Sequence, residues 1–141
     1  MSRTPTDPNA KIIEEFRANE GRVGGAFQGV GLLLLHHAGA RSGQSRINPL
    51  AYLRDGDRYV VFASRGGSPS NPAWYHNLKA HPQASIEVGT DSFEVDASEA
   101  DGEERERLFR TQVERVPQFG EYERRSGRRI PVMVLSPRSS G

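Results

Sequence analysis

The chain has 141 residues, which is enough for one domain with its own core and too few for two ordinary domains. Nineteen basic side chains stand against 18 acidic ones, and the net charge of +1 excludes a global field that would draw the protein to nucleic acid or a membrane. Cysteine is absent, so disulfides, thiol catalysis and thiolate metal sites are excluded. Lysine occurs only at Lys11 and Lys79, so most cations are arginines, which favour planar, bidentate contacts with carboxylates or phosphates.

Residues 1–29 predict a short amphipathic helix followed by a glycine-rich lead-in. Pro8 suits the first helical position, and Ile12, Ile13 and Phe16 share one face of the helix. This apolar face could pack on the rest of the domain or lie on a lipid surface, and the acidic residues of the helix favour packing. No signal peptide is evident, and no apolar run approaches the roughly 20 residues that span a bilayer. We therefore expect a cytoplasmic protein, with this helix as the one segment suited to peripheral membrane contact.

Six apolar or alternating runs predict strands. They cover residues 30–36, 47–53, 59–64, 84–88, 92–97 and 130–135. Because proline cannot donate a hydrogen bond to a neighbouring strand, Pro49 predicts an edge strand, a bulge or a surface left free for a ligand. If residues 30–64 form a three-stranded meander, the loops after its first and third strands lie at the same end of the sheet.

Helices are expected at the margins of these strands. Asn71 and Pro72 predict the N-cap and first position of a helix that ends near residue 80. Asp101 with Glu104 predicts a capping box that opens another helix, whose charged face, Arg105 included, is expected in solvent.

Together these elements predict an α+β domain built around a small six-stranded barrel with flanking helices. The barrel would occupy residues 30–136, with a short irregular or helical connection over residues 117–129. Residues 137–141 would form a frayed tail.

The most specific stretch is residues 63–78, ASRGGSPSNPAWYHNL, which joins a strand end, a glycine loop and a helix start. Gly66 and Gly67 permit positive φ and let backbone N–H groups approach a ligand, and Arg65 adds a permanent cation. The helix N-terminus that follows also favours an anion. A structural turn is the alternative, because the spacing matches neither a P-loop nor a dinucleotide-binding fingerprint.

A second candidate anion site is the loop over residues 38–46, which has glycines at positions 39 and 43 and cations at Arg41 and Arg46. Other chemistry is sparse: the four histidines show no metal-ligand spacing, no Ser–His–Asp order stands out, and carboxylates are scattered on exposed helices. Two anion-binding loops with few catalytic side chains suit an enzyme whose cofactor carries the reaction. They also suit a module that binds a phosphorylated ligand without catalysis.

At these residues the sequence resembles the deazaflavin-dependent nitroreductase family, the F420-dependent oxidoreductases of actinobacteria. The family pattern G-x-[KR]-SG-x-x-R-x-NPL occurs at residues 39–50, and AS-[KR]-GG with NP-x-WY-x-NL-x-A-x-P occurs at residues 63–82. The resemblance extends over residues 30–136. It implies a split β-barrel, related to the flavin-binding pyridoxamine phosphate oxidases, with one coenzyme F420 per chain.

By this resemblance, four groups of residues surround the coenzyme. The phosphate and the acidic glutamate tail would be held by Arg41, Ser42, Gly43 and Arg46, and the phosphate and ring would be bordered by Ser64, Arg65, Gly66 and Gly67. The tricyclic ring would be lined by Pro49, Leu50, Ala51 and Phe62, and the helix that walls the pocket would carry Trp74 and Asn77. For Trp74 the alternative is a core anchor of that helix. Arginine-rich, lysine-poor loops suit a tail of repeated carboxylates.

The reaction implied is hydride transfer from reduced F420 to an electron-poor acceptor, with Tyr122 and Ser64 as catalytic candidates. Tyr122 matches one of three tyrosines that the nitroimidazole-reducing member places near its substrate, but the other two positions are Val116 and Phe119 here. Quinones and enones are therefore at least as plausible as nitro compounds. The alternatives are an FMN-binding split-barrel oxidase-like protein and a non-catalytic F420 carrier. Both a monomer and a homodimer are compatible with the sequence.

Overall fold

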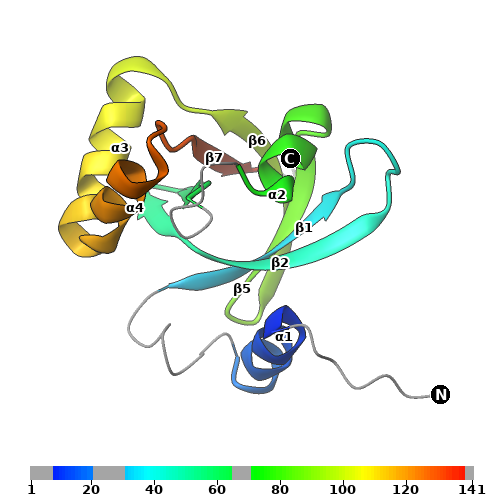
Figure 1. The fold of residues 1–141 in the computed structure, drawn as a ribbon. Helices are drawn as coiled ribbons and strands as arrows, with labels where there is room; N and C mark the ends of the chain where they lie inside the picture. Colours follow the sequence, from blue (N-terminus) through cyan, green and yellow to red (C-terminus); the bar gives the residue numbers. More distant parts are fainter. Residues whose placement is uncertain (1–7, 21–30, 65–70, 139–141) are drawn as a thin grey trace.

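The computed structural model of the protein describes residues 8–20, 31–64 and 71–138. These residues form four helices and seven strands (Figure 1). The helices are α1 (Pro8–Ala18), α2 (Ala73–Ala80), α3 (Gly102–Arg115) and α4 (Gln118–Ser126). The strands are β1 (Leu32–Ala38), β2 (Ser45–Ala51), β3 (Leu53–Asp55), β4 (Arg58–Phe62), β5 (Gln83–Val88), β6 (Asp91–Glu99) and β7 (Val132–Pro137).

The strands form one antiparallel sheet in the order β2-β1-β5-β6-β7-β4-β3, which curls into a half-barrel (Figure 1). Successive side chains of a strand point to opposite faces, so the sheet buries two sets of residues. Leu33 of β1, Val61 of β4 and Leu135 of β7 belong to the set inside the curl, where Trp74 and Leu78 of α2 pack against them. The expected α+β class is confirmed.

The strand predicted over residues 47–53 is broken at Tyr52, which is why the sheet has seven strands rather than six. Its first part, β2, pairs with β1 at one edge of the sheet, whereas its second part, β3, pairs with β4 at the other edge. The Tyr52 N–H donates to the Gly31 carbonyl at 3.0 Å and holds the bend. The three-stranded meander predicted for residues 30–64 is therefore wrong, because β2 and β3 form the two opposite edges of the sheet. The edge position of β2 confirms one of the alternatives given for Pro49.

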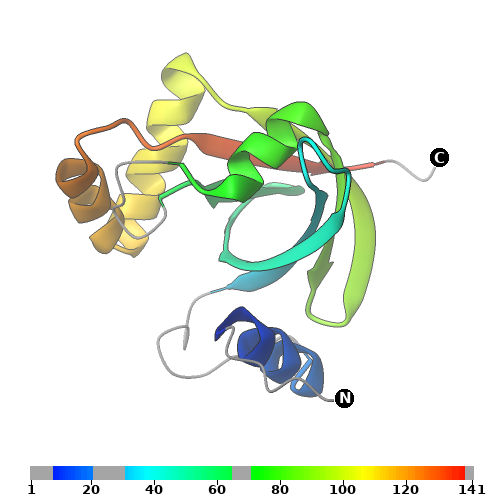
Figure 2. The ribbon, with the colours of Figure 1, turned by 45° about the vertical axis from the view of Figure 1, so that its right-hand side comes forward.

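Three helices cover the outer side of the sheet at two separate places (Figures 1 and 2). α3 and α4 pack on β4 and β7, where Phe62 and Phe109 join one buried cluster. α1 packs on β1 and β2 through Phe16, which is 1% exposed, and Arg17 donates to Glu87 of β5 at 2.7 Å. Packing, one of the two uses expected for the apolar face of α1, is thereby confirmed. Within the described ranges, no helix has the length and apolar character needed to cross a membrane.

Most strand boundaries differ from the prediction by one or two residues, and these differences change the predicted loop and tail. β1 continues to Ala38 and β2 begins at Ser45, so the loop predicted over residues 38–46 is a shorter turn over residues 39–44. β7 continues through Pro137, and Arg138 beyond it donates to Asp96 at 3.1 Å. The frayed tail is therefore wrong for the first two of its residues, and residues 139–141 lie outside the described part.

Neither predicted N-cap residue makes the side-chain hydrogen bond expected at the start of its helix. The N-cap of α2 is Pro72 rather than Asn71, whose side-chain oxygen accepts a hydrogen bond from Arg128 at 2.5 Å. Asp101 does occupy the N-cap of α3 but makes no side-chain capping bond, and Glu104 pairs with a residue of β4 instead. Asn71 and Glu104 thus serve contacts between elements rather than within one helix.

The charged face of α3 is solvent-exposed as predicted except at Arg105, where the prediction is wrong. Arg105 is 4% exposed, and its guanidinium lies 4.4 Å from the centroid of the Phe109 ring. It donates to Glu123 of α4 at 2.6 Å and to the Ile130 carbonyl at 2.7 Å. An arginine can be buried when its charge is paired in this way, and the pair joins α3 to α4. α4 itself confirms a helical connection within residues 117–129.

Candidate functional site

The turn between β1 and β2 has a closely fixed backbone. The Gly39 N–H donates to the Gln44 carbonyl, and the Gly43 N–H donates to the Gly39 carbonyl, both at 2.9 Å. Gly43 has a φ of 70°, a conformation that glycine adopts without strain. A Cβ atom on Gly39 would lie 2.6 Å from Ser42 Oγ, so a larger residue there would require the Ser42 side chain to shift. Arg41, Ser42 and Gly43 are consequently presented to solvent at the tip of a rigid turn.

Arg41 in this turn and Arg46 on β2 are exposed cations. Neither side chain forms a hydrogen bond or an ion pair with another residue of the described ranges. Two forked guanidinium groups without a carboxylate partner favour an anionic ligand, since each keeps its donors available. The structure therefore leaves both predicted residues exposed, Arg41 in the turn and Arg46 near the start of β2.

Asn77 of α2 holds the turn from the inside. Its Oδ1 accepts a hydrogen bond from the Ala40 N–H at 2.8 Å, and its Nδ2 donates to His37 Nδ1 at 3.1 Å. The other ring nitrogen of His37, Nε2, donates to Asn48 Oδ1 of β2 at 2.7 Å. Because Asn77 and His37 are buried, each polar atom needs its partner. We call these bonds the Asn77–His37–Asn48 relay, and they tie α2, β1 and β2 together around the turn.

The relay requires a neutral imidazole at His37, because Nδ1 must accept the amide hydrogen of Asn77. Burial lowers the pKa of His37, and the nearby charge of Arg46 also lowers it, although the hydrogen bond to Asn48 acts in the opposite direction. The neutral form is therefore favoured. His36, on the opposite face of β1, instead contacts Glu87.

The predicted ring-lining residues of β2 are divided between its two faces. Leu50 packs inside the curl, in the cluster that contains Trp74. Pro49 lies opposite Leu34 on the outer face that α1 covers, and Ala51 shares that face. Trp74 itself is 5% exposed and packs as a core side chain of α2.

Phe62 and Tyr122 belong to one aromatic cluster on the outer side of β4. The Phe62 ring lies 5.6 Å from the ring of Phe119, and the Phe119 ring lies 5.4 Å from that of Tyr122, both edge-on. Phe62 is buried, whereas Tyr122 is half-buried on α4. Phe119 stands at one of the two positions where the nitroimidazole-reducing member has a tyrosine. Its ring therefore links Phe62, a predicted ring-lining residue, to Tyr122, a predicted catalytic residue.

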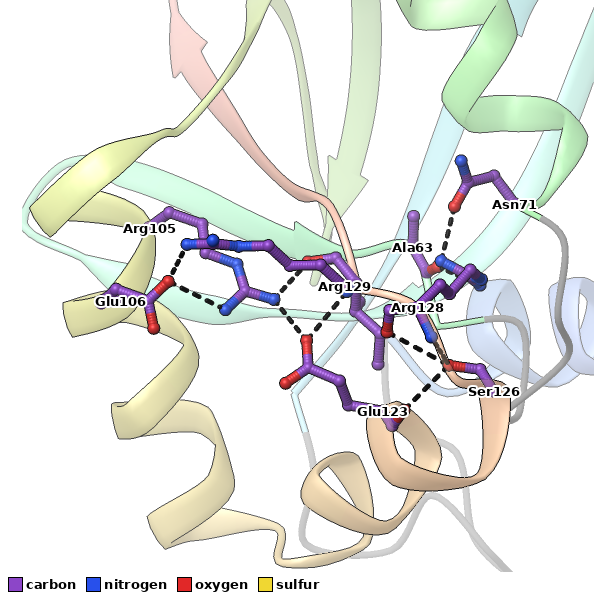
Figure 3. A network of polar contacts seen from close by, with 9 residues as sticks. Ala63, Asn71, Arg105, Glu106, Glu123, Ser126, Arg128 and Arg129 are labelled. Carbon is purple, nitrogen blue, oxygen red and sulfur yellow. Dashed lines mark hydrogen bonds and ion pairs between the residues drawn. The ribbon is translucent and has the colours of Figure 1, made fainter.

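Arg128, which follows α4, connects the end of β4 to the start of α2 (Figure 3). Its Nη2 donates to the carbonyls of Ala63 at 3.0 Å and Ser64 at 3.1 Å. Its Nη1 donates to Asn71 Oδ1 at 2.5 Å. Ser64 is buried at this junction, and the predicted site residues Arg65, Gly66 and Gly67 lie outside the described residues.

Sequence reasoning missed His37 and Arg128. His37 could have been identified, because it continues the inward alternation of Leu33 and Leu35 along β1. Arg128 carries no local signal, since its partners lie 57 to 65 residues earlier in the chain. In the described parts of the chain, no three His, Asp or Glu side chains group in a way that could hold a metal ion.

Comparison with known proteins identifies relatives over nearly the whole chain. A family model described as F420H(2)-dependent quinone reductase matches residues 10–137. An F420H(2)-dependent quinone reductase of Mycobacterium tuberculosis is 41% identical over 127 residues, covering 87% of this chain and 85% of that protein. The solved F420-H2 dependent reductase FDR-A has a TM-score of 0.70 and 36% identity, covering 75% of this chain and 94% of its own.

Two further solved structures resemble the chain. One, described as a domain-swapped dimer, has a TM-score of 0.71 and 32% identity, covering 92% of this chain and all of its own. A putative pyridoxamine 5'-phosphate oxidase from Listeria innocua has a TM-score of 0.55 at 12% identity, covering 94% and 95% of the two chains. At that identity the likeness concerns the fold alone, and it confirms the expected split-barrel architecture.

Proposed function

Since the chain belongs to the F420H(2)-dependent quinone reductase family, we propose that its β1–β2 turn and α2 bind coenzyme F420 and that α4 borders the quinone. The protein is an F420-dependent oxidoreductase, as the motifs predicted. Reduced F420, when bound, supplies the hydride that reduces the acceptor. We place the coenzyme here because two exposed cations, Arg41 in the turn and Arg46 near the start of β2, lie without a carboxylate partner among the described residues.

The chemistry of this turn suits the phosphate and the glutamate tail that the motifs imply for the coenzyme. Each guanidinium can bind a carboxylate or phosphate through two donors. The N–H groups of Arg41 and Ser42 make no backbone hydrogen bond among the described residues, so they can add donors to the same anion. Because the Asn77–His37–Asn48 relay fixes the turn, little ordering cost remains when a ligand binds.

For the acceptor we propose that Tyr122 holds or donates the proton that the reduced quinone oxygen takes up, with Ser64 at the coenzyme side. Of the three positions that carry tyrosines in the nitroimidazole-reducing member, only Tyr122 has a phenol here, because the other two are Val116 and Phe119. Its ring packs edge-on against the Phe119 ring, with 5.4 Å between the ring centroids.

A fluorescence titration with F420 and, separately, FMN tests the coenzyme site. The double variant Arg41→Ala with Arg46→Ala is compared with Arg110→Ala combined with Arg125→Ala, which removes the same charge from exposed positions on α3 and α4. We expect preference for F420, and a rise in its Kd of about tenfold for each arginine removed from the turn. The control should bind like the natural protein. Preferential FMN binding, or equal Kd values for the two double variants, would contradict the proposal.

We propose a homodimer as the assembly. A solved structure 32% identical to the chain is described as a domain-swapped dimer, which supports this choice over a monomer. Light scattering of the purified protein should give twice the chain mass of 15.6 kDa, and a single chain mass would exclude the dimer at the concentration measured.

A further inference from the structure

We propose that Arg128 is a positioning residue of the coenzyme site, which fixes the end of β4 relative to the start of α2 so that Ser64 and Asn77 are presented together. This inference rests on the proposed function, because Ser64 and Asn77 belong to the site through that proposal. Arg128 lies in neither of the sequence motifs that predicted the site.

The shape of the guanidinium explains why an arginine suits this place. One of its terminal nitrogens, Nη2, donates to the carbonyls of Ala63 and Ser64 at 3.0 and 3.1 Å, while the other, Nη1, donates to Asn71 at 2.5 Å (Figure 3). The planar group is rigid, so it sets the separation of the acceptors on its two sides. A lysine ammonium is a compact charge on a flexible stem and lacks this fork.

The chain around Arg128 is itself held in place by α4. Gly127 ends α4 with a φ of 69°, and the Arg128 N–H donates to Ser126 Oγ at 3.2 Å. Beyond it, the Ile130 N–H donates to Glu123 Oε2 at 2.9 Å. The helix that carries Tyr122 therefore determines where the Arg128 guanidinium can reach.

The buried pair of Arg105 and Glu123 extends this support to α3. Figure 3 shows Arg105 bonded to the same carboxylate that accepts the Ile130 N–H. The contacts thus run from α3 through α4 to Arg128, and from Arg128 to the two elements that carry Ser64 and Asn77. Loss of Arg128 should disturb the coenzyme side while leaving the aromatic cluster of Phe62, Phe119 and Tyr122 in place.

The test compares four single variants of the full chain: Arg128→Ala, Arg128→Lys, Asn71→Ala and the matched control Arg129→Ala. Arg129 is the next residue, and its side chain is exposed and paired with Glu106 on the surface. For each variant the Kd of F420 is measured by fluorescence, the KM of a water-soluble quinone by steady-state kinetics, and folding by circular dichroism. The double variant Arg128→Ala with Asn71→Ala is included to measure coupling.

We expect Arg128→Ala and Arg128→Lys to raise the Kd of F420 by about tenfold with the quinone KM unchanged, because charge alone does not replace the fork. Asn71→Ala should give a smaller rise that disappears in the Arg128→Ala background, since both changes break one contact. If Arg128→Ala does not fold, Asn71→Ala still tests the inference, because it removes one acceptor of the Arg128 guanidinium and should still raise the Kd of F420.

Two results would overturn the inference. One is a Kd for Arg128→Ala equal to that of Arg129→Ala, and the other is full recovery of F420 binding by Arg128→Lys. Failure of the proposed function looks different, because the natural protein itself would then show no preference for F420.

Discussion

Arginines serve two different purposes in two regions of this molecule. Around α4, Arg105 and Arg128 direct their donors inward, to a carboxylate, to backbone carbonyls and to an amide oxygen. At the β1–β2 turn, Arg41 and Arg46 extend into solvent, and the buried bonds are made by neutral groups such as His37. Neutral hydrogen bonds around the turn therefore leave the neighbouring cations available to a ligand, whereas the ionic contacts around α4 occupy the arginines there.

The largest effect is expected from breaking the ion pair between Arg105 and Glu123. Glu123→Ala leaves the buried Arg105 charge with only its longer contact to Glu106, at 3.3 Å, and removes the acceptor of the Ile130 N–H. Removing one partner of a buried ion pair costs about 3–5 kcal/mol, and because Glu106 remains and Glu123 is partly exposed, we expect a loss near the lower end of that range in the free energy of unfolding measured with urea.

The matched control for that variant is Glu121→Ala on the same helix. Glu121 pairs with Arg124, and both side chains are well exposed. An exposed pair contributes about 0–1 kcal/mol, so this change should be nearly neutral. Equal losses in the two variants would remove the distinction between buried and exposed pairs around α4.

A smaller effect is expected from breaking the Asn77–His37–Asn48 relay. Asn77→Ala removes the acceptor of the Ala40 N–H and the donor to His37, so the turn loses its fixed backbone. We expect a rise in the Kd of F420 of about tenfold, because a rigid turn no longer presents Arg41 and Arg46 together. His76→Ala, an exposed change on the same helix, is the control. Unchanged F420 binding by Asn77→Ala would show that the relay does not support the site.

The smallest effect is expected in the pH dependence of stability around His37. Because burial lowers the pKa of His37, the unfolded chain binds more protons than the folded one as the pH falls through the ordinary histidine value of about 6.5. Stability should therefore decrease between pH 7 and about 5.5, and His37→Gln should flatten that slope. The bond from Arg17 lowers the pKa of Glu87, whose contribution is lost only at more acidic pH, so it does not obscure this range. An unchanged slope in His37→Gln would contradict a neutral buried His37.

Much of the fold could be predicted because it depends on local patterns. The alternation in β1 places Leu33 and Leu35 on one face, and the same rule explains the burial of Val61 in β4. The break at Tyr52 could not be predicted in this way. It depends on the pairing of β2 with β1 and of β3 with β4 at opposite ends of the sheet, which no window of sequence contains.

The site was predictable where it is made of motif residues and unpredictable where it depends on distant contacts. Arg41 and Arg46 follow from their glycine-flanked loop, and the structure keeps them exposed. The charged stretch around Arg105 predicts an exposed side chain, and only the position of Glu123 on α4 explains its burial. Arg128 is similar, since the carbonyls of Ala63 and Ser64 and the amide oxygen of Asn71 lie far back in the chain.

We expect Arg41 and Arg46 to bind the acidic part of F420. This is tested by the Kd of F420 and of its deazaflavin core without phosphate and glutamate tail, for the natural protein and for Arg41→Ala combined with Arg46→Ala. The natural protein should bind F420 much more tightly than the core, and the double variant should lose most of this preference. If the double variant keeps the full preference for F420, the acidic part is bound elsewhere and the proposed site is wrong.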